Sequence, residues 1–329
     1  MTTTKKREPW IPGPRLQLEN ALTIDVEDWY HVAAFFPHID RSEWESLESR
    51  VERNTERLLA ILAERNIRAT FFVLGLVAEA RPQLIRKIAA AGHEIASHGY
   101  SHELVYRQTP ETFRAETYRA KAFLEDLLGH QVSGYRASTY SITRQSLWAL
   151  DILIDAGFEY DSSLFPVRHP QYGIPGAPRF PTRFVAPSGR SLVEFPLSTA
   201  KLFKASLPVA GGGYFRIFPY LYTKWGLTSI NEREQQPFIF YLHPWEIDPT
   251  QPRVANAGLT AKLRHYTHLD STEARLMRLF TDFKFTTVRQ VLENQALLLP
   301  QPPPAGSHPL SDQGAPRRKP AVAEFATTP

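Results

Sequence analysis

The sequence predicts an α/β fold built around a parallel sheet, and two observations lead to this class. Short apolar runs alternate with amphipathic helical segments through the first half of the chain, which is the order typical of βαβ units. The length of 329 residues suits one barrel-sized domain with tails. From the residue pattern alone we expect a barrel or a doubly wound sheet.

The individual elements follow from local patterns. Apolar and β-branched runs predict strands within residues 21–26, 68–80, 93–98, 132–138 and 237–243. Helical periodicity predicts helices in the second half of 41–67 and within 81–92, 109–129, 143–157 and 271–283. Pro82 near a first turn, and Gly92 and Gly129 at helix ends, support these boundaries.

The remaining chain divides into an N-terminal extension at 1–19, a domain at 20–299 and a tail at 300–329. Within the domain, residues from about 166 to 237 are rich in proline and glycine, which predicts a loop-rich insertion. Its segment 209–219, "VAGGGYFRIFP", is either a cover over a substrate or a plain tight turn. The tail, rich in Pro, Ala and Ser, is expected to be disordered.

Composition excludes several classes of protein. The net charge is only +4 and basic residues are mixed with acidic ones, so a nucleic-acid surface is not indicated. Without cysteine there is no disulfide and no thiolate metal site, and any metal must be held by His, Asp or Glu. The start of the chain lacks the apolar core of a signal peptide, and no run is long enough for a membrane span. We therefore expect a cytoplasmic enzyme.

Polar residues cluster at the ends of four predicted strands. They are "DVED" at 25–28, "SHGYSH" at 97–102, "YRAS" at 135–138 and "LHPWE" at 242–246. In a parallel α/β fold the carboxyl ends of the strands face one common mouth. These side chains are therefore candidates for a single site.

His98 and His102 are candidate metal ligands. Residues four apart share a face if the segment turns helically, and neutral imidazole is a common zinc ligand. A carboxylate from "DVED" would complete a His-His-carboxylate set, which activates water and polarises a carbonyl. An isolated pair of this spacing is more often engaged in ordinary hydrogen bonds, but its position after an apolar strand favours the metal site.

The other polar residues also have two interpretations each. Acidic residues after a strand often cap a helix. Three acidic residues within a stretch of four, however, usually need a metal or an arginine to offset their repulsion. Arg136 is a candidate for that arginine, although it could form a surface ion pair. His243 is either an interior histidine or the group that gives a proton to a leaving amine or alcohol.

Taken in order, these motifs resemble those of the polysaccharide deacetylase family, the carbohydrate esterases with a NodB-type domain. The five family motifs appear here as "TIDVED", "SHGYSH", "YRASTY", "YDSSLF" and "YLHPWE". The wording "DVEDWYH", "GGGYFR" and "LHPWEID" is most similar to deacetylases of exopolysaccharide loci in exosortase-bearing bacteria. The resemblance implies a distorted (β/α) barrel of the NodB type that removes acetyl groups from N-acetylhexosamine residues of a polysaccharide or its lipid-linked precursor.

The resemblance also implies a divalent metal, usually zinc, and a role for each matching residue. The metal ligands would be Asp28, His98 and His102. The spacing in "DVED" leaves open whether Glu27 or Asp28 reaches the metal, because the family usually has two adjacent aspartates. Gly99 stands where the family often has Ser or Thr, which leaves the histidine spacing intact.

The remaining implied residues are catalytic. Asp25 would be the general base, and Arg136 would hold it in its ionised form. His243 would protonate the leaving amine, and Asp161 would support or orient His243.

Two alternatives remain open from the sequence. Related NodB-type proteins resemble amidases that act on small cyclic amides or ureides, and the "DVED" spacing is compatible with that chemistry. A non-catalytic carbohydrate-binding protein would use the aromatic residues as stacking surfaces, but all the catalytic candidates are present. An N-acetylated glycan is the expected partner, nucleic acid is not, and the sequence leaves the oligomeric state open.

Overall fold

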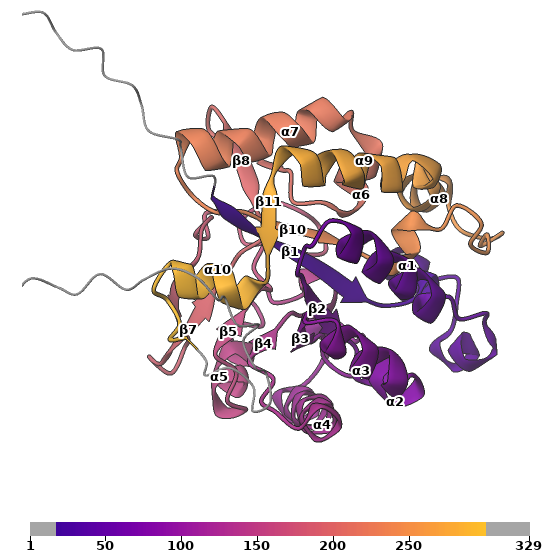
Figure 1. Cartoon of the computed structure of the whole chain (residues 1–329). Helices are drawn as coiled ribbons and strands as arrows, with labels where there is room; N and C mark the ends of the chain where they lie inside the picture. Colours follow the sequence, from indigo (N-terminus) through magenta and orange to yellow (C-terminus); the bar gives the residue numbers. More distant parts are fainter. Residues whose placement is uncertain (1–17, 301–329) are drawn as a thin grey trace, which may run out of the picture. The chain divides into compact units, whose positions relative to one another are not determined.

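The computed structural model describes residues 18–300 of the chain (Figure 1). Of the described residues, 18–298 form one compact unit, which holds all the helices and strands of this part of the chain. Most of the predicted N-terminal extension and of the predicted tail lies outside the described residues.

A mostly parallel sheet forms the centre of the fold (Figure 1). Its strand order is β10 (Ile239–Leu242), β1 (Glu19–Val26), β2 (Thr70–Val73), β3 (Glu94–Ser97), β4 (Gly134–Tyr135), β5 (Tyr160–Asp161), β7 (Ser191–Glu194) and β6 (Thr182–Val185). Only β6 runs antiparallel to its neighbour, and β11 (Lys284–Thr286) adds a further parallel pairing to β1. The predicted strand at 21–26 is confirmed as part of β1.

Helices follow the strands, as the alternating pattern predicts. They are α1 (Val51–Glu64), α2 (Gly75–Ala80), α3 (Pro82–Ala90), α4 (Pro110–Leu128), α5 (Trp148–Asp155), α6 (Gly212–Ile217), α7 (Tyr220–Thr228), α8 (Leu259–Tyr266), α9 (Leu269–Asp282) and α10 (Val288–Asn294). Helix α4 has the predicted signals, since the Thr109 side chain caps Thr112 N at 3.2 Å and Gly129 ends the helix in the left-handed conformation.

One predicted strand is too long. The prediction placed a strand within residues 68–80, but the structure ends β2 at Val73 and continues as α2. The chain turns where Gly75 N donates to Gly99 O at 2.9 Å. A Cβ atom at Gly75 would lie 2.4 Å from the Tyr100 ring, so glycine permits this close crossing.

The region 166–237, expected to be a loop-rich insertion, has several short regular elements among its loops. This region contains β6, β7, the hairpin of β8 (Thr199–Leu202) and β9 (Ala205–Pro208), and the helices α6 and α7. Its prolines and glycines separate short elements rather than preventing them, as at the turn between β6 and β7, where Gly189 has a φ of +86°.

This region completes the ring of strands. Beyond β5 and β7, Leu197 N donates to Leu164 O at 2.9 Å, and Val209 N reaches Ser198 O at 3.5 Å. Tyr241 N on β10 then donates to Ala210 O at 2.7 Å. The fold is therefore the predicted distorted (β/α) barrel.

The consecutive glycines within 209–219 have a packing role. Gly211 and Gly212 have φ values of +124° and +56°. A Cβ atom would lie 2.0 Å from Tyr241 O at the first position and 2.4 Å from Tyr241 Oη at the second. Glycine thus lets α6 begin directly against β10.

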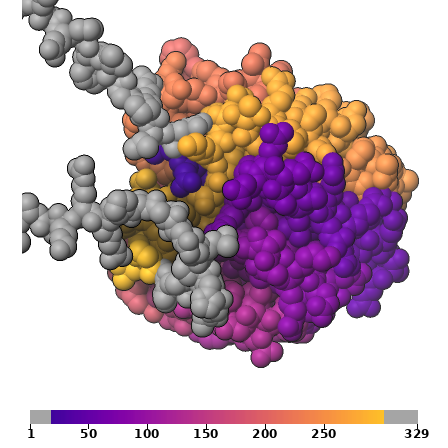
Figure 2. Space-filling view, in the orientation of Figure 1, coloured from indigo at the N-terminus to yellow at the C-terminus, as the bar shows by residue number. Residues whose placement is uncertain are grey.

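The start and the end of the described chain lie side by side, as Figure 2 shows for the indigo and yellow segments. The pairing of Ala21 with Thr286 accounts for this contact. None of the helices within residues 18–300 combines the length and the apolar character needed to cross a membrane.

Candidate metal centre and active site

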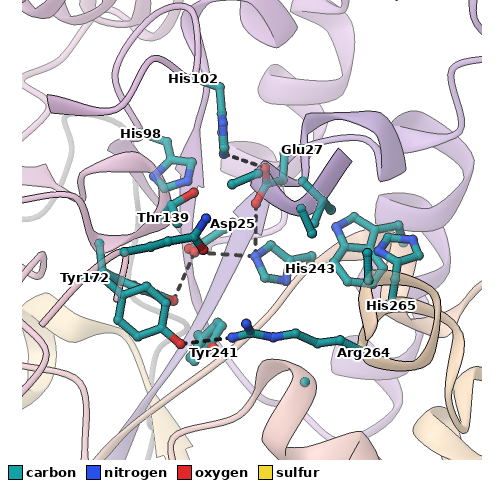
Figure 3. A pocket seen from close by; sticks show the side chains of 18 of the residues that line it. Asp25, Glu27, His98, His102, Thr139, Tyr172, Tyr241, His243, Arg264 and His265 are labelled. Atoms are coloured by element: carbon teal, nitrogen blue, oxygen red, sulfur yellow. Dashed lines mark hydrogen bonds and ion pairs between the residues drawn. The ribbon is translucent and has the colours of Figure 1, made fainter. Parts of the chain in front are cut away.

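Glu27, His98 and His102 form the group of side chains best suited to a metal ion (Figure 3). Each offers one ligand atom, and the three atoms lie within 4.8 Å of one another. All three residues are buried. Glu27 follows β1, and the two histidines follow β3, so the convergence of strand ends brings them together.

The hydrogen bonding of His98 suits a metal ligand. Its Nδ1 lies 2.8 Å from the carbonyl oxygen of Arg136. A carbonyl can only accept, so Nδ1 carries the proton and Nε2 keeps its lone pair. Fixing the tautomer through the second ring nitrogen is the usual arrangement for a metal-bound histidine.

Glu27 and His102 leave buried polar atoms without hydrogen bonds. Glu27 Oε2 lies 2.8 Å from His102 Nε2, but the contact does not have the geometry of a hydrogen bond, and His102 Nδ1 is also without a hydrogen-bond partner within the described part of the chain. Buried polar groups usually have a hydrogen-bond partner, and a bound cation would supply one for these two side chains. The donor set therefore fits a cation.

The charge state of Glu27 agrees with this assignment. Burial alone would raise the pKa of its carboxyl, but the neighbouring His102 and His243 hold that pKa well below its usual value. Glu27 is thus available as an anionic ligand.

Asp28, the expected third ligand, lies outside this group. Its Oδ1 accepts from Trp29 N at 3.1 Å, and its Oδ2 accepts from Arg50 N at 2.9 Å and from Val51 N at 3.2 Å. Side chains alternate along a strand, so Asp25 and Glu27 share the inner face of the barrel. The choice of Asp28 is corrected, because its side chain caps backbone groups instead.

Asp25 and Arg136 form a buried ion pair beside the metal group. Arg136 Nη1 donates to Asp25 Oδ1 at 2.6 Å and to Thr23 Oγ1 at 2.8 Å. Ser162 accepts from two other nitrogens of the same guanidinium. The structure thus brings Arg136 to Asp25, as the sequence led us to expect, and leaves Asp25 Oδ2 facing the pocket with Tyr140 Oη 3.4 Å away.

His243 is held by a residue that the sequence did not identify. Its Nδ1 lies 2.8 Å from Glu246 Oε1, and Arg216 Nε in turn donates to Glu246 Oε2 at 2.6 Å. The other nitrogen, Nε2, lies 2.9 Å from Glu27 Oε1 and 4.0 Å from Asp25 Oδ2. Burial alone would lower the pKa of His243, but the charges of Glu27 and Glu246 raise it to about 10.

Asp161, expected to orient His243, has different partners. It pairs with Glu194 across β5 and β7, and its Oδ1 accepts from Ser163 Oγ at 2.5 Å. Glu246, and not Asp161, is the carboxylate that contacts His243 Nδ1. Burial raises the pKa of Asp161 to about 6, and burial with the nearby Asp161 charge raises that of Glu194 well above its usual value.

This carboxyl pair makes stability depend on pH. The folded protein keeps protons on the pair that the unfolded chain releases, so stability is lost as pH rises from about 4 through about 6 for Asp161, and further as pH rises through the raised pKa of Glu194. Glu194→Gln replaces one acid with an amide that can donate to Asp161. We expect wild type to lose roughly 1 kcal/mol more stability than the variant between pH ~5 and pH ~7.5. Urea unfolding at both pH values measures this, and equal losses would contradict it.

Most of the candidate residues open into one pocket, with a cavity volume of about 130 Å³ (Figure 3). Asp25, Glu27, His98, His102 and His243 all line it. Aromatic side chains form much of the remaining wall, among them Tyr140, Tyr172, Tyr241 and Trp245. Such a wall combines apolar faces with a few fixed polar groups, which suits a sugar ring.

Sequence reasoning missed several residues of this site. Glu246 stands three positions after His243, the spacing of a capping box, and that spacing was a usable signal. His31, three positions after Asp28, accepts from Asp28 N at 3.0 Å and has the same signal. Arg216 and Arg264 also line the pocket. They lie in the later half of the chain, and only its folded path brings them there.

Comparison with protein families divides the chain into two matched regions. Residues 43–160 match the polysaccharide deacetylase family, and residues 162–293 match a domain of unknown function, DUF3473.

Curated relatives match shorter stretches. A chitooligosaccharide deacetylase of Sinorhizobium fredii is 52% identical over 48 residues, which is 15% of this chain and 22% of the relative. A peptidoglycan-N-acetylglucosamine deacetylase of Bacillus cereus is 32% identical over 98 residues, 30% of this chain and 36% of the relative. A peptidoglycan deacetylase of Helicobacter pylori is 31% identical over 108 residues, which is 33% of this chain and 36% of the relative. The chain thus spans about a third or less of the length of these relatives.

Solved structures show the same fold over most of the chain. A protein of Mycobacterium smegmatis assigned to the polysaccharide deacetylases has a TM-score of 0.55 at 21% identity, covering 90% of this chain and 99% of that one. An allantoinase has a TM-score of 0.53 at 17% identity, with coverages of 86% and 91%. Residues 43–160 thus carry a polysaccharide deacetylase domain, and the solved structures show the same fold over most of the chain.

Proposed function

We propose that this protein is a metal-dependent hydrolase that removes N-acetyl groups from N-acetylhexosamine residues of a glycan. One observation carries the proposal: Glu27, His98 and His102 meet in the same pocket as Asp25 and His243. The names of the relatives, deacetylases of chitooligosaccharides and of peptidoglycan, support this substrate class.

Glu27, His98 and His102 would hold the metal, which we propose to be zinc. Two imidazoles and one carboxylate form a donor set that zinc uses in hydrolases. When bound, such an ion polarises the amide carbonyl and lowers the pKa of water.

The chain's own residues divide the proton transfers between them. Asp25 Oδ2 would take a proton from the attacking water, while Arg136 fixes the other carboxylate oxygen. His243 Nε2, 4.0 Å from Asp25 Oδ2, would give a proton to the leaving amine nitrogen. The proposed base and acid therefore lie close together in one pocket.

Glu246 is expected to act as a positioning residue for His243. Glu246→Gln keeps the size of the side chain but removes the charge that faces His243 Nδ1 and Arg216 Nε. We expect kcat to fall by about 10- to 100-fold with little change in KM, by analogy with second-layer partners of active-site histidines. The pH profile of kcat should shift as well. An unchanged profile with reduced thermal stability would indicate a purely structural role.

We further propose that the substrate is an exopolysaccharide or its lipid-linked precursor. The support is the resemblance of the motifs "DVEDWYH", "GGGYFR" and "LHPWEID" to those of deacetylases of exopolysaccharide loci. Cytoplasmic localisation stays a prediction from the sequence.

Acetate release from N-acetylglucosamine oligomers by zinc-loaded protein tests the proposal. Release that disappears on metal removal and returns with zinc would support it. Opening of a small cyclic amide or ureide without acetate release would favour the amidase alternative. An allantoinase is among the proteins that share this fold. Glycan binding without either reaction would favour a carbohydrate-binding protein.

A further inference from the structure

Arg264 places a positive charge in the pocket, apart from the metal group. It lies on α8 and lines the pocket together with Tyr172. Its Nη2 donates to Tyr172 Oη at 3.0 Å, and Figure 3 shows the pair on the opposite side of the view from His98 and His102.

The other cations in or beside the pocket that could attract an anion already have carboxylate partners. Arg136 pairs with Asp25, Arg216 pairs with Glu246, and His243 contacts both Glu27 and Glu246. By contrast, Arg264 forms no ion pair with a carboxylate within residues 18–300. Its charge is therefore available to a ligand.

The surroundings hold Arg264 and Tyr172 in place. Arg216 Nη2 donates to the carbonyl oxygen of Arg264 at 3.1 Å, which ties the end of α8 to the pocket wall. The Tyr172 ring stacks on His169 with centroids 3.7 Å apart and an angle of 10°, and its Oη lies 3.2 Å from Tyr214 Oη. A binding site on these groups would need little rearrangement.

An arginine with free donors beside a tyrosine hydroxyl is suited to an oxyanion. Guanidinium binds carboxylate and phosphate through two parallel hydrogen bonds, whereas a neutral sugar hydroxyl does not require a full charge. The pocket also continues beyond the space that an acetamido group at Glu27 and the histidines would use.

We propose that Arg264, with Tyr172, binds an anionic group carried by the substrate. That group is either the carboxylate of a neighbouring uronic acid or a phosphate on the N-acetylhexosamine. The inference rests on the proposed function, because it places the acetamido group of the same substrate at Glu27, His98 and His102.

Kinetics on matched substrates test the inference. The substrates are neutral N-acetylglucosamine oligomers, N-acetylglucosamine 1-phosphate, and a disaccharide of N-acetylglucosamine with glucuronic acid. Arg264→Gln is expected to lower kcat/KM for one anionic substrate by about 10- to 100-fold, and by at least about tenfold more than for the neutral one. The anionic substrate that shows the larger loss identifies the source of the charge.

Lys262→Gln is the matched control, because it removes one positive charge from the same helix outside this pocket. Lys262→Gln should keep the wild-type preference among the substrates. Arg264→Lys should retain part of the preference for the anionic substrate that Arg264→Gln loses. Equal losses on neutral and anionic substrates in Arg264→Gln would overturn the inference while leaving the deacetylase proposal intact.

Binding gives a readout that does not depend on turnover. Calorimetry with zinc-loaded protein should show weaker binding of the preferred anionic sugar in Arg264→Gln than in wild type, by the same factor of about 10 or more. Equal affinity in both would overturn the subsite. If wild type releases no acetate from any substrate, the proposed function fails, and an Arg264-dependent affinity would still uphold the subsite.

Discussion

Replacing Glu27 with glutamine is expected to remove the metal and the activity together. Glu27 is the carboxylate that the fold brings to His98 and His102, and its Oε2 lacks a hydrogen-bond partner among the described residues. An amide is a poor zinc ligand, and altering even outer partners of a zinc site weakens binding by about 10- to 100-fold. We therefore expect zinc affinity to fall by more than about 100-fold. Elemental analysis after dialysis and a competitive zinc titration measure the loss.

Asp28→Asn is the matched control. It changes the adjacent carboxylate, whose oxygens accept from the backbone of Trp29, Arg50 and Val51. Zinc should remain bound, while the free energy of unfolding should fall by about 1 kcal/mol, as for the loss of a capping side chain. The opposite pattern, with zinc lost from Asp28→Asn and kept by Glu27→Gln, would make Asp28 the ligand.

The barrel could be predicted because its signals are local. Most apolar runs are followed by a helical pattern, the helices within 81–92 and 109–129 have their own boundary signals, and the ordered motifs place the polar residues at strand ends. His98, His102, Asp25 and Arg136 then meet for a topological reason, since the carboxyl ends of parallel strands share one mouth.

The choice between Glu27 and Asp28 was also contained in the sequence. Alternation along β1 sends Leu22, Ile24 and Val26 to the apolar layer under the helices. The same alternation continued by one residue puts Glu27 on the face of Asp25. The departure from the family's adjacent aspartates left Glu27 and Asp28 both open, and the alternation of side chains along the strand decides between them.

Other parts of the site could not be predicted from local sequence patterns. Asp161 meets Glu194 because β7 pairs beside β5 in that register, and the two residues lie in segments separated by an irregular stretch. Arg216 and Arg264 come from short helices in the region of 166–266, where proline and glycine obscure the periodicity. Contacts of this kind depend on strand order and loop path, which a single sequence does not specify.

Asp25→Asn is expected to abolish most of the hydrolysis while leaving the metal in place. Asparagine can still accept from Arg136 through its oxygen, so the geometry should be largely kept. It cannot take a proton, and loss of a general base costs about 100- to 10,000-fold in rate. Because Arg136 then lacks its counter-charge in a fully buried position, we also expect the variant to be less stable by on the order of 3 kcal/mol.

Three measurements on Asp25→Asn separate catalysis from folding: acetate release, zinc content and thermal unfolding of the zinc-loaded protein. A folded variant that keeps its zinc and binds N-acetylglucosamine oligomers, but releases acetate at least about 100-fold more slowly, would fit a general base. The same result would rule out the alternative that the protein only binds carbohydrate. A single substitution would then have abolished turnover without abolishing binding. A variant that keeps more than about a tenth of the wild-type rate would mean that another group takes the proton. His243, whose Nε2 lies 4.0 Å from Asp25 Oδ2, would then be the first residue to replace.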